Sequence, residues 1–187
     1  MRKSMGVLAA MLLLATLGAN EVKDEAKKSE AADKRAQIDT MAQEALDTLF
    51  AANSDAKALH EKSYGWAVFD NLKVAFVVSG GAGSGVAVQK DGQRTYMKMG
   101  TGGVGLGLGG QKYQVIFLFE NAQVFDNFVQ KGWKAETGAQ AAAGTEGANV
   151  GATFTEGLAI YQITEKGLMA SADISGTKYW KNEKLNK

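Results

Sequence analysis

KVAFVVSGGAGSGVAVQKDGQRTYMKMGTGGVGLGLGGQKYQVIFLFE, residues 73–120, is the stretch that decides the fold. Residues 74–78 and 115–119 are unbroken apolar runs rich in β-branched and aromatic types, which predicts strands covered on both faces. Between them, Asp91-Gly92 is the strongest hairpin signal in the chain and predicts a turn that joins residues 85–90 to residues 93–99. The stretch therefore predicts a glycine-rich, mostly antiparallel sheet.

Residues 101–110, TGGVGLGLGG, carry glycine at every second position from Gly103 to Gly109. In a strand, these glycines would leave one face with only hydrogen. Because glycine inside a strand packs nothing, the pattern indicates close approach of another backbone or sharp coiling of the sheet. Residues 105–110 also fit G-x-G-x-x-G, but that nucleotide-binding motif needs a following helix. Residues 111–114 show no capping residue and no helical period, and the predicted strand 115–119 follows them. We therefore expect a structural role for these glycines.

The first 19 residues predict a secretion signal. Arg2 and Lys3 precede the apolar or small stretch VLAAMLLLATL, residues 7–17, which is shorter than the ~20 residues of a membrane-spanning helix. We expect cleavage near residue 19 and a periplasmic or secreted bacterial protein; an uncleaved anchor is the alternative. Without a cysteine, the chain cannot be a lipoprotein of this route.

Composition excludes several classes of function. Removing residues 1–19 takes away Arg2, Lys3 and no acidic residue, so the net charge falls from +1 to −1, which argues against nucleic-acid binding. The absence of cysteine excludes disulfides, thiolate metal sites and cysteine nucleophiles. The chain has 187 residues and 45% hydrophobic content, enough for one domain with a core.

Helical patterns precede and follow the glycine-rich stretch. Residues 20–37 are charged with alternating sign and predict a solvated helical leader. Residues 38–50 carry an apolar stripe at helical spacing, and residues 54–62 predict a short helix with Ser54 as its cap. Residues 122–129 predict another amphipathic helix, ended at Gly132.

The last third of the chain predicts a loop followed by strands. Residues 135–151 are small and weakly patterned, which indicates the loop, and residues 150–154, 158–164 and 168–174 predict three strands. We therefore expect an α+β domain over residues 38–187. Its core would be a strongly coiled, mostly antiparallel sheet of about six to eight strands, coiled towards a barrel, with the two amphipathic helices packed against it.

No residue pattern predicts catalysis, a cofactor or a metal. The only histidine, His60, lacks a second histidine or a cysteine to complete a site, so we expect it at the surface. Gly83-Ser84-Gly85 resembles half of an esterase elbow, but Ala82 breaks the G-x-S-x-G spacing. Carboxylate pairs on loops stay possible, although none forms a recognisable group. We expect a protein that is not an enzyme.

The order of several blocks resembles the SYLF domain, also called the Ysc84 family. These blocks are KSYGWAVFDNLKVAFVVSGGAGSGVAV, GVGLGLGGQ, VIFLFENAQVFDNF and YQITEKGLMASADISGTKY, and they span roughly residues 42–186. Members of that family bind membrane lipids, phosphoinositides in eukaryotes, and some bind actin filaments. The resemblance thus implies lipid or membrane-surface binding. A secreted chain does not meet actin, so we do not expect that partner.

Two short motifs combine the residue types that a phospholipid surface attracts. Lys131, Trp133 and Lys134 place two ammonium groups beside an interfacial aromatic side chain, and Tyr179-Trp180-Lys181 repeats the combination. Each could equally be a core tryptophan next to solvated lysines. We take Lys131, Trp133 and Lys134 as the candidate lipid site of an envelope protein. The alternative function is a structural or protein-interaction role in the envelope without a lipid ligand.

Overall fold

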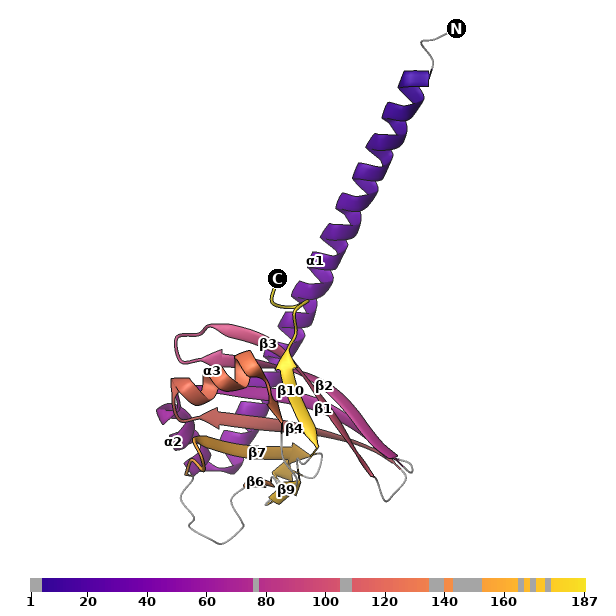
Figure 1. Ribbon diagram of the computed structural model, residues 1–187. Helices are drawn as coiled ribbons and strands as arrows, with labels where there is room; N and C mark the ends of the chain where they lie inside the picture. The colour runs from indigo at the N-terminus through magenta and orange to yellow at the C-terminus, as the bar shows by residue number, and fades with distance from the viewer. Residues whose placement is uncertain are drawn as a thin grey trace.

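Figure 1 shows the computed structural model of the chain, which describes residues 5–75, 78–104, 109–134, 140–142, 153–164, 167–168, 171–173 and 176–187. Side chains are described outside residues 1–24, 73–79, 103–111, 135–152, 165–166 and 169–175. The elements follow in the order α1 (Met5–Ala52), α2 (Ser54–Lys62), β1 (Gly65–Ala75), β2 (Val78–Gln89), β3 (Arg94–Val104), β4 (Gly109–Phe119), α3 (Ala122–Lys131), β5 (Trp133–Lys134), β6 (Gln140–Ala142), β7 (Leu158–Thr164), β8 (Gly167–Leu168), β9 (Ser171–Asp173) and β10 (Thr177–Lys181).

Eight of these strands form one antiparallel sheet in the order β5-β10-β3-β2-β1-β4-β7-β8. Strands β1, β2 and β3 follow one another as hairpins, and β4 returns to pair with the free edge of β1. This order, 4-1-2-3, is that of a Greek key. The predicted α+β class and the predicted number of strands are both confirmed.

The sheet curls into a half-barrel. The ring of Tyr179 on β10 lies 5.0 Å from that of Phe117 on β4 and 4.7 Å from that of Phe69 on β1, measured between ring centroids. In a flat sheet, β10 and β4 would be about 19 Å apart, four spacings of about 4.8 Å, too far for the two rings to meet. The predicted strong coiling is therefore confirmed by side-chain contacts across the concave face.

Each face of the sheet carries its own hydrophobic core. On one face α1 and α2 pack over a core that includes Val68, Val86 and Ile116. On the other face, which is the concave one, α3 packs over an aromatic core around Phe117 and Phe128. Figure 1 shows α3 in front of the sheet and the C-terminal part of α1 behind it. The prediction that residues 115–119 are covered on both faces is confirmed, because alternate residues of this run belong to the two cores.

Glycines on the concave side of β2 make room for large neighbours. A Cβ atom on Gly85 would overlap the carbonyl oxygen of Val68 and lie 2.5 Å from Cδ1 of Phe69. A Cβ atom on Gly83 would overlap the carbonyl oxygen of Asp70 and lie 2.9 Å from Cγ of Met99. Close approach and coiling, predicted for the glycines of residues 101–110, thus explain two glycines of β2.

The three helices begin and end at recognisable residues. Helix α1 continues from the predicted leader into the predicted helix 38–50 without a break, and its apolar stripe is buried at Ile38, Ala42 and Leu49. The cap of α2 is Asn53, whose side chain accepts a hydrogen bond from the Ala56 amide, so the prediction of Ser54 was wrong by one residue. Helix α3 ends at Gly132, as predicted.

Two strand predictions were wrong, because the residues of each expected strand divide between two strands of the sheet. Residues 74–78 are split between β1 and β2, and Ala75 pairs with Ser79 across the hairpin. Residues 101–110 are split between β3, which ends at Val104, and β4, which begins at Gly109. The connection, residues 105–108, lies outside the description. Strand β4 follows it and contains the predicted strand 115–119.

Three predictions in the last third of the chain need correction. Residues 140–142, expected in a loop, form β6, and residues 168–174 form parts of two strands, β8 in the large sheet and β9 paired with β6. Thr153 and Phe154 belong to no strand, and residues 150–152 lie outside the description. Strand β10 was not predicted. Strand β7 has the bounds expected from the sequence.

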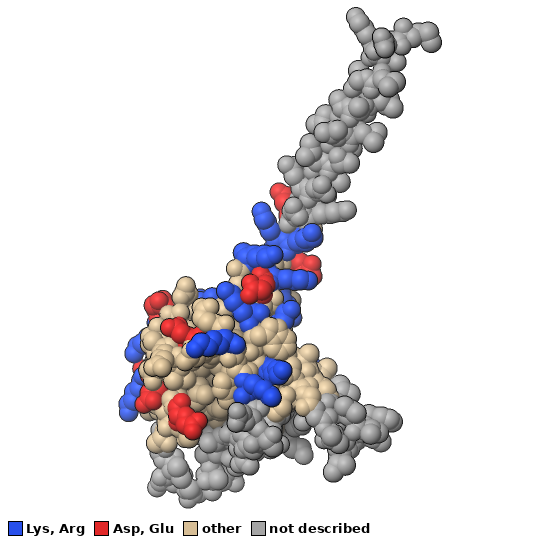
Figure 2. Space-filling view, viewed as in Figure 1, with Lys and Arg blue, Asp and Glu red and all other residues tan. Residues whose placement is uncertain are grey.

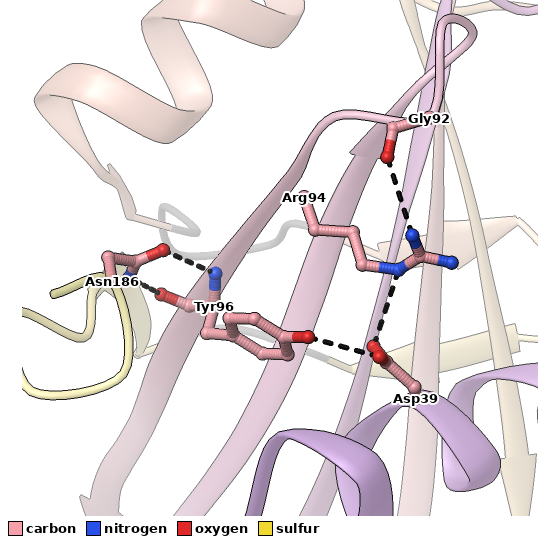
Figure 3. A network of polar contacts seen from close by, with 5 residues as sticks. All are labelled: Asp39, Gly92, Arg94, Tyr96 and Asn186. Atoms are coloured by element: carbon pink, nitrogen blue, oxygen red, sulfur yellow. Dashed lines mark hydrogen bonds and ion pairs between the residues drawn. The ribbon is translucent and has the colours of Figure 1, made fainter. Parts of the chain in front are cut away.

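The C-terminal residues close one end of the sheet. Figure 3 shows the Asn186 side chain donating to the Tyr96 carbonyl at 2.7 Å and accepting from the Tyr96 amide at 3.0 Å. The Tyr96 hydroxyl donates to Asp39 of α1 at 3.0 Å, and Arg94 forms an ion pair with the same carboxylate at 3.6 Å. Asn186 thus continues the pairing of β3 beyond β10 and links it, through Tyr96, to α1.

Helix α1 extends well beyond the sheet (Figure 1). Among the described residues, no helix combines the length and the apolar content that crossing a bilayer requires. The predicted secretion signal, residues 1–19, falls on residues whose side chains lie outside the description, so the signal and the domain boundaries at residues 20 and 38 stay predictions.

Candidate functional site

One row of residues crosses the sheet on the side where α1 packs, beyond the part that the helix covers. We call it the lysine-flanked row, and its members pair in register from β5 to β4: Lys134, Lys178, Gly100, Ala82, Leu72 and Lys112. The α1 core reaches Val68 on β1, and Leu72 lies two pairs further along the same face. Gly100 is half-buried and the other members are exposed.

The centre of this surface is apolar. Leu72 is 48% exposed and Trp180 is 44% exposed, and they are the large hydrophobic side chains found exposed among the described residues. Trp180 lies on the same face as the row, and its indole covers Gly100, where an added Cβ would be 3.1 Å from Cη2 of the ring. The bare glycine therefore lets the tryptophan lie close to the backbone of β3.

The edges of this surface are basic. Lys134 and Lys178 are directly opposite each other on β5 and β10, an arrangement that is unfavourable for two like charges. Lys112 lies at the other end of the row, and Lys98 pairs with Trp180. No carboxylate among the described side chains forms an ion pair with these four lysines. The acidic group on this part of the face is Asp70, one pair nearer to α1 than Leu72.

The structure places the three residues of the candidate lipid site in different surroundings. Lys131 is exposed in the last turn of α3, and Gly132 turns the chain with φ 74° into β5. The half-buried ring of Trp133 lies 5.5 Å from that of Phe117, on the concave face. Lys134 points to the opposite face and belongs to the lysine-flanked row. Trp133 is thus a core tryptophan, the alternative that the sequence had left open.

Trp180 belongs to the second motif predicted from the sequence, whereas Leu72, Lys98, Lys112 and Lys178 were not predicted. These residues lie on four different strands, and the segments that hold them are separated by up to about a hundred positions. The sequence does contain one signal, the alternation of apolar and polar residues, which indicates the exposed side of each strand separately. Only the order of the strands brings these positions into one surface.

The leader helix presents mixed charge. Figure 2 shows lysine and arginine side chains interleaved with aspartate and glutamate along the exposed part of α1. Arg35 leaves this pattern, because its guanidinium donates to the Leu185 carbonyl at 3.0 Å and so ties the helix to the C-terminal segment. The near balance of charges, expected from the sequence, gives this helix little net attraction for an anionic surface.

His60 is half-buried, and the prediction of a surface histidine was wrong. Its ring lies 5.0 Å from that of Phe50 and 6.3 Å from that of Trp66, and Nε2 is buried without a partner among the described residues. Burial lowers the pKa of His60 below 6.5, and the nearby Glu61 opposes this only in part. The imidazole therefore packs as a neutral aromatic ring between α1, α2 and β1.

The position of His60 predicts a pH-dependent stability. The folded chain prefers the neutral ring, so the contribution of His60 to the free energy of unfolding is complete above pH 6.5. It decreases as the pH falls from 6.5 towards the lower pKa that His60 has in the folded chain. We expect the free energy of unfolding to decrease between pH 7.5 and pH 5.5, and we expect His60→Gln to reduce that decrease. Urea unfolding of both proteins at the two pH values measures the difference. Equal pH dependence in both proteins would contradict the assignment.

The described residues offer little support for catalysis. They contain no group of three or more histidine, aspartate or glutamate side chains that could hold a metal. Ser84 lies in the middle of β2, not at the strand-to-helix turn of an esterase elbow. The His60 ring is enclosed by aromatic rings, and its Nε2 has no hydrogen-bond partner among these residues.

The chain is similar to known proteins of one family. The family model Ysc84, described as "Las17-binding protein actin regulator", matches residues 100–187. Residues 100–187 therefore belong to a Ysc84-family domain. A curated relative, Beta cell expansion factor A from Aeromonas veronii, is 46% identical over 156 residues, which cover 83% of this chain. Neither name describes an enzyme. The family predicted from the ordered sequence blocks is confirmed.

The extent of these matches differs from the extent of the fold. The Ysc84 match begins inside β3, whereas β1 and β2 form the middle of the same sheet, so the folded unit includes residues before the match. The match with the curated relative covers 60% of that protein, so the chain spans about three fifths of its length.

Proposed function

We propose that this Ysc84-family protein binds the surface of a phospholipid membrane through the lysine-flanked row and Trp180, without catalysing a reaction. The observation that carries the proposal is the combination of exposed Leu72 and Trp180 with lysines at both ends of one sheet row. The resemblance to lipid-binding SYLF domains supports the same function. With the predicted secretion signal, it favours a place in the bacterial envelope, where neither actin nor a cytosolic partner is expected.

The residue types fit the layers of a membrane interface. Tryptophan prefers the depth of the headgroups, and a leucine beside it reaches the first part of the acyl chains. Each lysine near an anionic surface contributes about 1 kcal/mol, so Lys98, Lys112, Lys134 and Lys178 together offer about 4 kcal/mol at low salt. Such a surface would bind reversibly, because it lies on the membrane and does not span it.

Vesicle co-sedimentation tests the proposal. We expect the wild-type chain to bind vesicles of mixed phosphatidylcholine and phosphatidylglycerol, and to bind more weakly as the anionic fraction falls or the salt rises. Leu72→Ser with Trp180→Ser should weaken binding about tenfold by removing the apolar contact. Lys112→Glu with Lys178→Glu should weaken it more, since four units of charge change at the surface.

Matched variants locate the surface. Lys57→Glu with Lys62→Glu makes the same change in net charge at exposed positions of α2 and should leave binding nearly unchanged. Lys131→Glu with Lys134→Glu tests the site expected from the sequence, and we expect it to act through Lys134. If the wild-type chain binds no vesicle, the structural or protein-interaction role in the envelope becomes the better proposal.

A further inference from the structure

The C-terminal segment that follows β10 forms a compact turn. We call residues 182–187 the strap. Within it the Leu185 amide donates to the Asn182 carbonyl at 3.0 Å, and the Asn186 side chain donates to the same carbonyl at 2.8 Å. Asn182 and Leu185 are buried, and Leu185 belongs to the hydrophobic core on which α1 packs. The strap therefore has an inner side that contacts the rest of the fold.

On β3, the strap takes the place of a paired strand. Lys181 is the last residue of β10 that pairs with β3, and after it the Asn182 amide donates to the Tyr96 carbonyl at 2.9 Å. The Asn186 side chain contacts both backbone polar groups of Tyr96 (Figure 3). A side-chain amide offers the same donor and acceptor as a peptide group. Hydrogen bonds to one residue, Tyr96, thus hold the strap on the edge of β3.

The strap also contacts the leader helix. Within residues 25–37, every residue is exposed except Ala31 and Arg35, which lie one turn apart on the same face of α1. The Arg35 guanidinium donates to the Leu185 carbonyl at 3.0 Å, and Ala31 packs against the core to which Leu185 belongs. From Ile38 onwards, α1 packs on the sheet itself. The last turns of the leader therefore meet the strap before the helix reaches the sheet.

Residues 25–37 depend on such a partner for their order. A short helix is only marginally stable in water unless it packs against something, and pairs of opposite charge at helical spacing, such as Glu30 with Lys34, stabilise it little. The sheet does not depend on the strap in this way, because β3 pairs with β2 from Arg94 to Val104. Loss of the strap contacts should therefore open the leader locally, before the domain unfolds.

We propose that the strap is a switch that controls the order of the leader helix. With the strap on β3, residues 31–37 continue α1 as an ordered helix. When the strap leaves, Arg35 loses its partner and Leu185 leaves the core, so these residues unfold while the sheet and the rest of α1 stay folded. A ligand that binds the edge at Tyr96 or the inner side of the strap would favour the released state. The switch uses no residue of the lysine-flanked row, so it is independent of membrane-surface binding.

Hydrogen–deuterium exchange of the full chain, measured by mass spectrometry, tests the proposal. In Leu185→Ser with Asn186→Ala, we expect the amides of residues 31–37 to exchange about tenfold faster than in the wild-type chain, because the strap no longer holds them. The amides of β2 and of residues 42–49 should keep their wild-type rates. Glu183→Ala with Lys184→Ser is the matched control: it changes two exposed residues of the strap and should leave the leader unchanged.

Arg35→Ala tests the same contact from the helix side and decides the question if the double variant does not fold. Alanine is the better helix former, so faster exchange of residues 31–37 in this variant would come from the lost contact with the strap. Wild-type exchange of these residues, in the double variant or in Arg35→Ala, would overturn the proposal. It is also overturned if the double variant exchanges faster throughout the domain, since the strap would then only be part of the global fold.

Discussion

Replacing Gly85 by alanine is expected to lower the free energy of unfolding by about 3 kcal/mol or more, because the added methyl group has no space. It would overlap the carbonyl oxygen of Val68 and lie 2.5 Å from the ring of Phe69. Both atoms belong to β1, the central strand, and the oxygen is part of the backbone. The contact is relieved only if β1 and β2 separate, which would disturb the curl of the whole sheet.

Gly80→Ala is the matched control for this change. Gly80 lies in the same strand, but an added Cβ would have no atom within 4 Å. We therefore expect stability to stay within about 1 kcal/mol of the wild-type value, with a small gain from the lower flexibility of alanine. Urea unfolding followed by circular dichroism compares the three proteins. Equal stability of the two variants would show that β1 and β2 are not as close as described.

Phe117→Ala is expected to lower the free energy of unfolding by about 3–5 kcal/mol, the usual loss when a buried phenylalanine is truncated. Phe117 is fully buried, and its ring contacts those of Phe69, Phe128, Trp133 and Tyr179. These partners come from β1, α3, β5 and β10. The cavity left by the truncated side chain would therefore loosen the contacts that β4 makes with four other elements.

Trp180→Ala is the control that distinguishes the loss of a buried ring from the loss of any aromatic ring. Trp180 is on the open side of β10 and is 44% exposed, so we expect its truncation to change stability by about 1 kcal/mol or less. Trp133 fluorescence should also shift in Phe117→Ala, because the two rings are neighbours. A loss of stability below about 1 kcal/mol in Phe117→Ala would mean that the concave face is not packed as described.

The helices could be predicted because their signals are local. The stripe at Ile38, Ala42 and Leu49 spans about three helical turns and fixes which face of α1 is buried. The glycine directly after Lys131 fixes where α3 ends. The Asp91-Gly92 hairpin is equally local: Gly92 has φ 91°, and the Gln93 amide donates to the Asp91 carboxylate at 2.9 Å. The chosen cap of α2 was one residue away because both Asn53 and Ser54 are good caps.

Strand boundaries in the glycine-rich stretch were harder to predict. Glycine serves equally well inside a strand that needs close approach and between strands, so residues 101–110 gave no signal for where β3 ends. Residues 74–78 contain no glycine, and their unbroken apolar run gave no signal for where β1 ends. Strand β10 was missed for a different reason. Its residues alternate between the concave core and solvent, but only pairing with β3 shows that Tyr179 is buried and Trp180 is exposed.

The sequence by itself determined the fold class, the helices, the hairpin at Asp91-Gly92 and the family, because these depend on residues close together in the chain or on the order of blocks. Tertiary structure alone decided which lysines and apolar residues share a surface. It separated Trp133 from Lys134, and it aligned Lys112, Leu72 and Lys178 in one row. The physical reason is strand order: neighbours across a sheet are fixed by backbone pairing between distant segments, which local patterns do not specify.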